Sequence, residues 1–108
     1  MTEDVISKIE ADIKGNKVVI FMKGSPDSPM CGFSAASVQI LKSFPYPFKG
    51  VDILANPEIR ATLPQYSNWP TFPQIFIDGE LVGGCDILHS MRDSGELETL
   101  LKKTFDSK

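Results

Sequence analysis

Cysteine is scarce in this chain of 108 residues, which has only Cys31 and Cys85. Two cysteines are too few for a disulfide-rich secreted scaffold, so we expect free thiols in a reducing compartment. They are also too few to fill by themselves the four ligand positions of a 2Fe–2S cluster. Any such cluster would need further ligands from a second chain or from a small molecule.

Long apolar runs and an excess of positive charge are missing as well. No apolar run approaches the roughly 18 residues of a membrane span, and the acidic residues 1–4 predict neither a secretory signal nor an Arg-rich transit peptide. The net charge of −3 argues against nucleic acid, because phosphate binding needs a basic surface. We expect no nucleic-acid or membrane partner, and a cytoplasmic protein, or an organellar one if a transit peptide was removed.

The length and the hydrophobic pattern predict a single domain, residues 1–108, in which helices and strands alternate. Helices are predicted over 5–13, from 32 to a break at 43–47, from 57, from 86 and over 97–105. Strands are predicted over 18–22, 48–53, 74–77 and 80–82, with a loop over 23–29 and a hairpin turn at Asp78-Gly79. This order predicts a small mixed sheet with helices on both faces.

Several helix details follow from single residues. Asn56 is expected to cap the third helix, with Pro57 at its first position, and Pro64 is expected to shorten or distort that helix. Asp86 is expected to cap the fourth helix. The second helix should have one apolar side made of Phe33, Ala36, Ile40 and Leu41.

Cys31 lies between a Pro-rich loop and the start of a predicted helix. The free N–H groups and positive potential of a helix N-terminus stabilise a thiolate, which nucleophilic and metal-binding thiols need. Lys23, at the end of the first predicted strand, can add positive charge. The alternative, a small apolar core residue, fits poorly with its proline, glycine and polar neighbours.

Ser34 takes the place of the second sulfur in a dithiol redox motif of the form Cys-x-x-Cys. A hydroxyl cannot form a disulfide with Cys31, so two-thiol exchange is excluded at this position. A second thiol has to come from elsewhere. Cys85 follows Gly83-Gly84 and can be a resolving thiol, a backbone contact to a ligand, or a packing residue.

Four motifs, in order and at compatible spacings, make the chain resemble monothiol glutaredoxins of the CGFS type over about residues 5–105. The motifs are Met22-Lys23-Gly24-Ser25-Pro26, Cys31-Gly32-Phe33-Ser34, Trp69-Pro70-Thr71-Phe72-Pro73-Gln74 and the run from Asp78 to Asp86. The resemblance implies a thioredoxin fold, with a four-stranded mixed sheet flanked by helices and an extra N-terminal helix. It also implies a glutathione site and a 2Fe–2S cluster that bridges two subunits.

In such a homodimer each chain would give one cysteine, matching Cys31, and hold one glutathione whose sulfur completes the ligand set. One thiolate and one glutathione per chain give four sulfurs from two chains, which agrees with the preference of iron–sulfur clusters for thiolates. Family members pass clusters to acceptor proteins and pair with BolA-type proteins. A variant model replaces glutathione with Cys85 of both chains.

The resemblance also implies a set of glutathione-binding residues: Lys23, Arg60, Phe72, Cys85 and Asp86. Lys23 and Arg60 resemble family residues that meet the carboxylates of glutathione, although either can be a solvated side chain. The resemblance implies a cis Phe72-Pro73 bond, which would turn the Phe72 backbone toward the ligand for strand-like pairing.

Asp86 suits the γ-glutamyl ammonium, and the backbone N–H groups of Cys85 and Asp86 suit the neighbouring carboxylate. Gly83 and Gly84 permit close backbone approach or simply make a strand-to-helix turn. We assign no chemistry to Trp69, and a lone His89 on a helix is expected at the surface rather than as a ligand.

Two functions are compatible with these residues. The first is a cluster carrier without substrate turnover. The second is a glutathione-dependent thiol oxidoreductase that removes glutathione from mixed disulfides, an activity that is generally weak in the CGFS type. A purely structural interaction module would leave the loop thiol unexplained.

Overall fold

The computed structural model describes residues 3–106. The helices in this range are α1 (Glu3–Gly15), α2 (Gly32–Lys42), α3 (Pro57–Ser67), α4 (Cys85–Ser94) and α5 (Glu96–Asp106). The strands are β1 (Val18–Met22), β2 (Gly24–Ser25), β3 (Ser28–Pro29), β4 (Lys49–Asp52), β5 (Gln74–Ile77) and β6 (Glu80–Gly83). The predicted order of elements is confirmed, but the segment predicted as a loop contains the short hairpin β2–β3.

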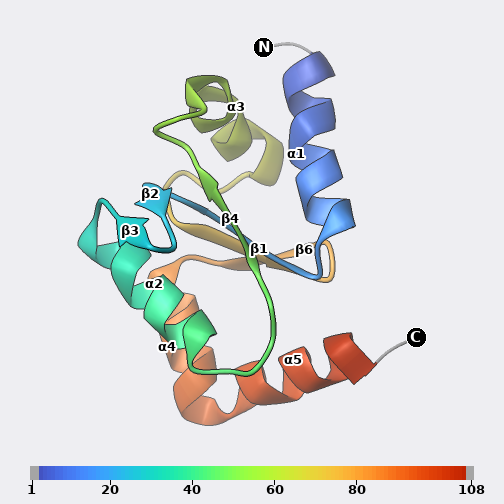
Figure 1. Cartoon of the computed structure of the whole chain (residues 1–108). Coiled ribbons are helices and arrows are strands. Elements are labelled where there is room, and N and C mark those ends of the chain that lie inside the picture. Colours follow the sequence, from blue (N-terminus) through green and yellow to red (C-terminus); the bar gives the residue numbers. More distant parts are fainter. Residues whose placement is uncertain (1–2, 107–108) are drawn as a thin grey trace.

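Four strands form one mixed sheet in the order β4-β1-β5-β6 (Figure 1). β1 is parallel to β4 and antiparallel to β5, and β6 is antiparallel to β5. The turn between β5 and β6 has positive φ at Asp78 (54°) and Gly79 (80°), as a two-residue hairpin turn favours. The predicted thioredoxin fold is therefore confirmed, with α1 as the additional N-terminal helix.

The alternation of side chains along β1 divides the core into two layers. Val18, Ile20 and Met22 pack with residues of α2, α4 and α5 on one face of the sheet. Val19 and Phe21 pack with residues of α1 and α3 on the other face. Figure 1 shows this arrangement, with α1 and α3 above the sheet and α2, α4 and α5 below it. A strand covered on both faces needs a continuous apolar run, which explains why this segment was predictable.

The predicted apolar side of α2 is wrong in its first turns. Phe33 is 64% exposed and Ala36 is exposed, whereas the fully buried side chains there are Ser34 and Ser37. Ser37 can be buried because its hydroxyl donates a 2.9 Å hydrogen bond to the carbonyl oxygen of Phe33. The prediction holds for Ile40 and Leu41, at the end of the helix that covers the sheet.

The start and the interior of α3 differ from the prediction in two ways. Asn56 is the N-cap residue with Pro57 following, but its side chain makes no cap bond and donates instead to the Asp52 carbonyl, at 2.8 Å. Pro64 lies inside the helix, which continues to Ser67. None of the helices within residues 3–106 is long and apolar enough to cross a bilayer.

Candidate functional site

Four chain segments meet at one end of the sheet because of the strand directions. β1 ends there and leads through the β2–β3 hairpin to Cys31. β5 is antiparallel to β1, with Gln74 opposite Phe21, so the residues that precede β5 lie at the same end. β6 is antiparallel to β5, so it ends there and leads into α4. β4, parallel to β1, ends there as well and leads into α3.

Cys31 is the N-cap residue of α2, with an extended backbone (φ −155°, ψ 149°). Burial raises the pKa of its thiol, but hydrogen bonds from the Ser34 backbone and hydroxyl and from the Phe33 backbone lower it, as does the charge of Lys23. The net result is a pKa below the ordinary value for cysteine. The expectation of a stabilised thiolate at this helix start is confirmed, and its physical cause is hydrogen bonding to the charged form.

Ser34 is fully buried, and its hydroxyl oxygen accepts a 3.1 Å hydrogen bond from the backbone N–H of Lys23. Because that N–H already occupies a lone pair of the oxygen, the hydroxyl proton is free to point at the sulfur of Cys31. The sequence identified Ser34 only as a missing thiol. The structure gives it a second role as a donor to the thiolate, which depends on the backbone of Lys23, eleven residues away.

Replacing Ser34 with alanine is expected to move the pH profile of Cys31 alkylation to higher pH. The thiolate is the reacting form, so the rate rises as pH increases through the pKa, and loss of a donor to the thiolate raises that pKa. Iodoacetamide kinetics in a Cys85→Ser background would measure this shift at Cys31 alone. Ser37→Ala is the matched control, because Ser37 is equally buried on α2 and bonds a carbonyl instead. Equal profiles for the two variants would contradict the role of Ser34.

The β2–β3 hairpin that precedes Cys31 is anchored by β4. The carboxylate oxygen Oδ1 of Asp52 accepts hydrogen bonds from the backbone N–H groups of Gly24 (3.0 Å) and Leu54 (2.8 Å). Gly50 lets the hairpin pack closely, because an added Cβ there would collide with the ring of Pro26. The contacts of Asp52 with Gly24 and of Gly50 with Pro26 hold the segment that leads to the thiol, and the sequence pattern did not indicate them.

A pocket of about 760 Å³ lies at this end of the sheet. All five residues predicted to bind glutathione line it. The complete lining consists of Lys23, Phe33, Arg60, Pro64, Trp69, Pro70, Thr71, Phe72, Pro73, Gly84, Cys85, Asp86 and Ile87. The pocket therefore combines the end of β1, the start of α2, helix α3, the segment before β5 and the start of α4.

Charged groups of both signs face this pocket without a partner of opposite sign. Within residues 3–106, neither Lys23 nor Arg60 has a carboxylate at ion-pair distance, and Asp86 has no cationic partner. Asp86 lies in the first turn of α4. Two cations and one anion arranged in this way suit a ligand that itself carries two carboxylates and one ammonium group.

Backbone groups of the segment before β5 and of Gly84 also line the pocket. The Phe72-Pro73 bond is cis, as expected. In the described part of the chain, the N–H and C=O of Phe72 make no backbone hydrogen bond, so both are available to an extended ligand. Gly84 packs against Trp69 and the Pro73 carbonyl, and an added Cβ would lie 3.3 Å from that oxygen.

Comparison with known proteins gives the same assignment as the motifs. The glutaredoxin family model matches residues 18–82. Glutaredoxin 4 of Escherichia coli strain K12 is 57% identical over 99 residues, covering 92% of this chain and 86% of the relative. Glutaredoxin 4 of Haemophilus ducreyi is 52% identical over 101 residues, covering 94% of both chains. The chain belongs to the glutaredoxin family.

Solved glutaredoxin structures share the fold. The solution structure of reduced poplar apo GrxS14 superimposes with a TM-score of 0.84 at 48% identity and covers 95% of this chain and 94% of its own. With Ser34 in place of a second cysteine, this glutaredoxin is of the monothiol type, and the predicted resemblance is confirmed.

The start of α4 in this glutaredoxin corrects one prediction. Gly84 is the N-cap residue and no side chain caps the helix, so the expectation that Asp86 caps it is wrong. The helix begins one residue before Asp86, which leaves the carboxylate free to face the pocket. Cys85, the first residue of the helix, and Cys31 are both free, partly exposed thiols.

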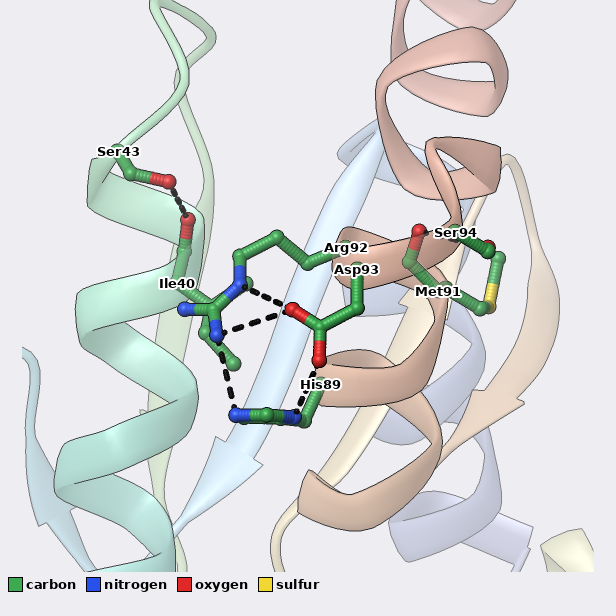
Figure 2. A network of polar contacts seen from close by, with 7 residues as sticks. All are labelled: Ile40, Ser43, His89, Met91, Arg92, Asp93 and Ser94. Carbon is green, nitrogen blue, oxygen red and sulfur yellow. Dashed lines mark hydrogen bonds and ion pairs between the residues drawn. The ribbon is translucent and has the colours of Figure 1, made fainter.

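His89 of this glutaredoxin lies on the surface of α4, as expected. Figure 2 shows it in a closed set of contacts with Arg92 and Asp93. His89 Nδ1 lies 3.3 Å from Asp93 Oδ2, and His89 Nε2 lies 3.0 Å from an Arg92 guanidinium nitrogen, which also contacts Asp93. Arg92 and His89 thus contact each other on the surface of α4. Neither residue lines the pocket.

Proposed function

We propose that this monothiol glutaredoxin binds glutathione in the pocket and that two chains together hold a 2Fe–2S cluster through their Cys31 thiolates, for delivery to acceptor proteins. The observation that carries the proposal is a stabilised lone thiolate, with a buried serine in place of its redox partner, beside a pocket lined by Lys23 and Phe33, the neighbours that help to lower the pKa of that thiol. Within residues 3–106, the charged side chains of this pocket have no ion-pair partner.

The number of available thiolates supports a cluster whose ligands come from two chains. A cluster needs four ligands, and the surroundings of Cys31 lower the pKa of its thiol. Within residues 3–106 no group of three or more metal-ligating side chains lies together, so one chain alone offers too few ligands. Cys31 from each of two chains and one glutathione sulfur per chain complete the set, and each bound glutathione would bring its sulfur to the pocket beside the cysteine.

The chemistry of glutathione supports the pocket assignment. Arg60 and Lys23 suit the two carboxylates, because each offers donors and no carboxylate within residues 3–106 neutralises it. Asp86 suits the γ-glutamyl ammonium, beside the free N–H groups at the start of α4. The open backbone of Phe72 suits the central peptide of the ligand.

Several broader assignments belong to the same proposal. We infer that residues 1–108 form a single domain, because one sheet is shared by both layers of the core. Cytoplasmic location is supported by the two free thiols, which persist under reducing conditions. A BolA-like protein and iron–sulfur acceptor proteins are the expected partners, by the resemblance to CGFS glutaredoxins.

Anaerobic reconstitution with iron, sulfide and glutathione tests the proposal. We expect a coloured dimer that contains one 2Fe–2S cluster and two glutathione molecules, measured by visible absorption, analytical ultracentrifugation and thiol analysis. A cluster that persists after exhaustive removal of glutathione would contradict glutathione ligation and favour the model with Cys85. Failure of the chain to take up any cluster would overturn the carrier function.

Replacing Arg60 with glutamine is expected to weaken glutathione binding by about tenfold or more, because a hydrogen bond to a charged group contributes ~1.5–3 kcal/mol and 1.4 kcal/mol is a factor of ten. The effect should shrink at high ionic strength, since Arg60 is exposed. Calorimetric titration with glutathione measures the affinity. Arg92→Gln is the matched control, because Arg92 is held by His89 and Asp93 outside the pocket. An equal loss in both variants would remove Arg60 from the site.

A second function is favoured by the lowered pKa of Cys31. The thiolate can attack the glutathione sulfur of a mixed disulfide and release the protein thiol, and a second glutathione thiolate can then regenerate Cys31 with formation of glutathione disulfide. We rank this activity below cluster transfer, because the resemblance to CGFS glutaredoxins implies that it is weak. Robust turnover in a glutathione-coupled reductase assay, in the absence of a cluster, would reverse this order.

A further inference from the structure

Gln74 is a fully buried polar residue at the start of an otherwise apolar strand. Its three successors in β5, residues 75–77, are all apolar and buried. Burying an amide is unfavourable unless its polar atoms are hydrogen-bonded, so its presence in the core needs a reason.

The side-chain nitrogen Nε2 of Gln74 donates two hydrogen bonds to one loop. It lies 2.9 Å from the carbonyl oxygen of Trp69 and 3.2 Å from that of Thr71. This loop, residues 69–73, forms one wall of the pocket. In the described part of the chain its only backbone–backbone hydrogen bond runs from the Trp69 N–H to the Pro64 carbonyl. The amide of Gln74 is therefore the main polar anchor of that wall.

The other end of the same amide has no partner. The oxygen Oε1 of Gln74 is buried and accepts no hydrogen bond from the described residues. An unpaired buried acceptor lowers stability, and an apolar side chain of the same shape would avoid this loss. Stability of the core alone does not explain glutamine here, whereas the two bonds to the loop do.

Trp69 links this loop to the start of α4. An added Cβ at Gly84 would lie 3.5 Å from Nε1 of Trp69 and 3.3 Å from the Pro73 carbonyl oxygen, so the loop packs directly on Gly84. Nε1 of Trp69 is buried without a hydrogen-bond partner in the described residues. Packing rather than hydrogen bonding therefore holds the indole, and its position depends on the loop backbone that Gln74 bonds.

We propose that Gln74 is a positioning residue: its amide sets the Trp69–Pro73 loop, and through that loop it aligns the Phe72 backbone and the Gly84 turn that together receive glutathione. The inference rests on the proposed glutathione site for its functional consequence. The placement of the loop by Gln74 does not depend on that site. Gln74 itself does not line the pocket, so it affects the ligand only by positioning the residues to which it is bonded.

Replacing Gln74 with methionine tests this role, because methionine keeps the length of the side chain and removes both donors. Trp69 is the single tryptophan, so its emission reports on the loop directly. We expect iodide quenching of Trp69 to rise about twofold or more and glutathione to bind about tenfold more weakly, as a wall that is no longer pre-organised must be ordered on binding. Gln74→Asn, whose amide is too short for the same bonds, is the second variant if the first does not fold.

Phe76→Leu is the matched control. Phe76 lies two residues along the same strand, in the core layer of α1 and α3, and it neither lines the pocket nor offers a polar group to the loop. This variant should lose thermal stability and keep both Trp69 quenching and glutathione affinity. Unchanged quenching and affinity in folded Gln74→Met would overturn the proposal. If the unmodified protein binds no glutathione, the proposed function fails, while the quenching comparison still decides whether Gln74 places the loop.

Discussion

Replacing Cys31 with serine is expected to abolish cluster binding, whereas replacing Cys85 with serine is expected to leave it intact. Iron–sulfur clusters select thiolates, and a serine hydroxyl stays protonated under conditions in which the Cys31 thiol ionises. Ser34 cannot take over as a ligand, because it is fully buried and its oxygen already accepts the N–H of Lys23.

The measurement is the visible absorption and iron content of each variant after anaerobic reconstitution with glutathione. Thermal unfolding of the apo proteins serves as the control for folding, because Cys31 is partly exposed and its replacement by serine should change stability little. Retention of the cluster in Cys31→Ser, together with its loss in Cys85→Ser, would transfer the ligand role to Cys85.

Replacing Phe21 with alanine is expected to destabilise the protein by about 3–5 kcal/mol, a large share of the roughly 5–15 kcal/mol that holds a typical domain together. Phe21 is fully buried in the central strand. Its ring packs edge-on against Phe76 of the neighbouring strand, with centroids 5.7 Å apart and an interplanar angle of 82°. The substitution removes this contact and leaves a cavity in the layer beneath α1 and α3.

Urea unfolding followed by circular dichroism measures this loss. Phe33→Ala is the matched control, because the same substitution is made at a side chain that is 64% exposed. We expect its midpoint to stay close to that of the unmodified protein. A change below about 1 kcal/mol in Phe21→Ala would contradict this role of the ring, because it would show that the core relaxes around the missing side chain.

Much of the fold was predictable because it depends on local patterns. The run Val18–Met22 is apolar throughout, as a strand covered on both faces must be, and Asp78-Gly79 has the residues that a tight hairpin turn favours. The helix start at Gly32 was predictable because the segment rich in proline, glycine and serine ends just before it. Each of these signals lies within a few residues, so tertiary context is not needed to read it.

The sequence-based predictions fail at positions where contacts between distant parts of the chain determine the local structure. Phe33 has the spacing of a buried helix residue, yet it is exposed because Ser34 and Ser37 occupy the buried side of the first turns of α2, which leaves Phe33 to line the pocket. Asp86 has the residue type of a helix cap, yet Gly84 starts the helix and the carboxylate faces the pocket. In both cases a residue at the functional end of the sheet departs from the local rule, as expected where binding competes with packing.

Three side chains of the site had no sequence signal for their roles. Asp52 bonds the hairpin, Ser34 bonds the Lys23 backbone and Gln74 bonds the loop at Trp69. Asp52 and Ser34 reach partners 28 and 11 residues away in the chain. The sequence predicts Gln74 only as a strand residue and assigns no chemistry to Trp69, because no local pattern links a buried amide to the loop before it.

The sequence by itself determined that Cys31 stands alone at the start of a helix, that serine replaces its redox partner, and that helices and strands follow one another in the order of a glutaredoxin. These are properties of residue type and short spacing. Only the tertiary structure decided that the Ser34 hydroxyl also stabilises the thiolate and that Lys23, Arg60 and Asp86 face one pocket, without an ion-pair partner within residues 3–106. The reason is that strand direction brings together the ends of segments far apart in the chain, and only there do their hydrogen bonds and charges act on one another.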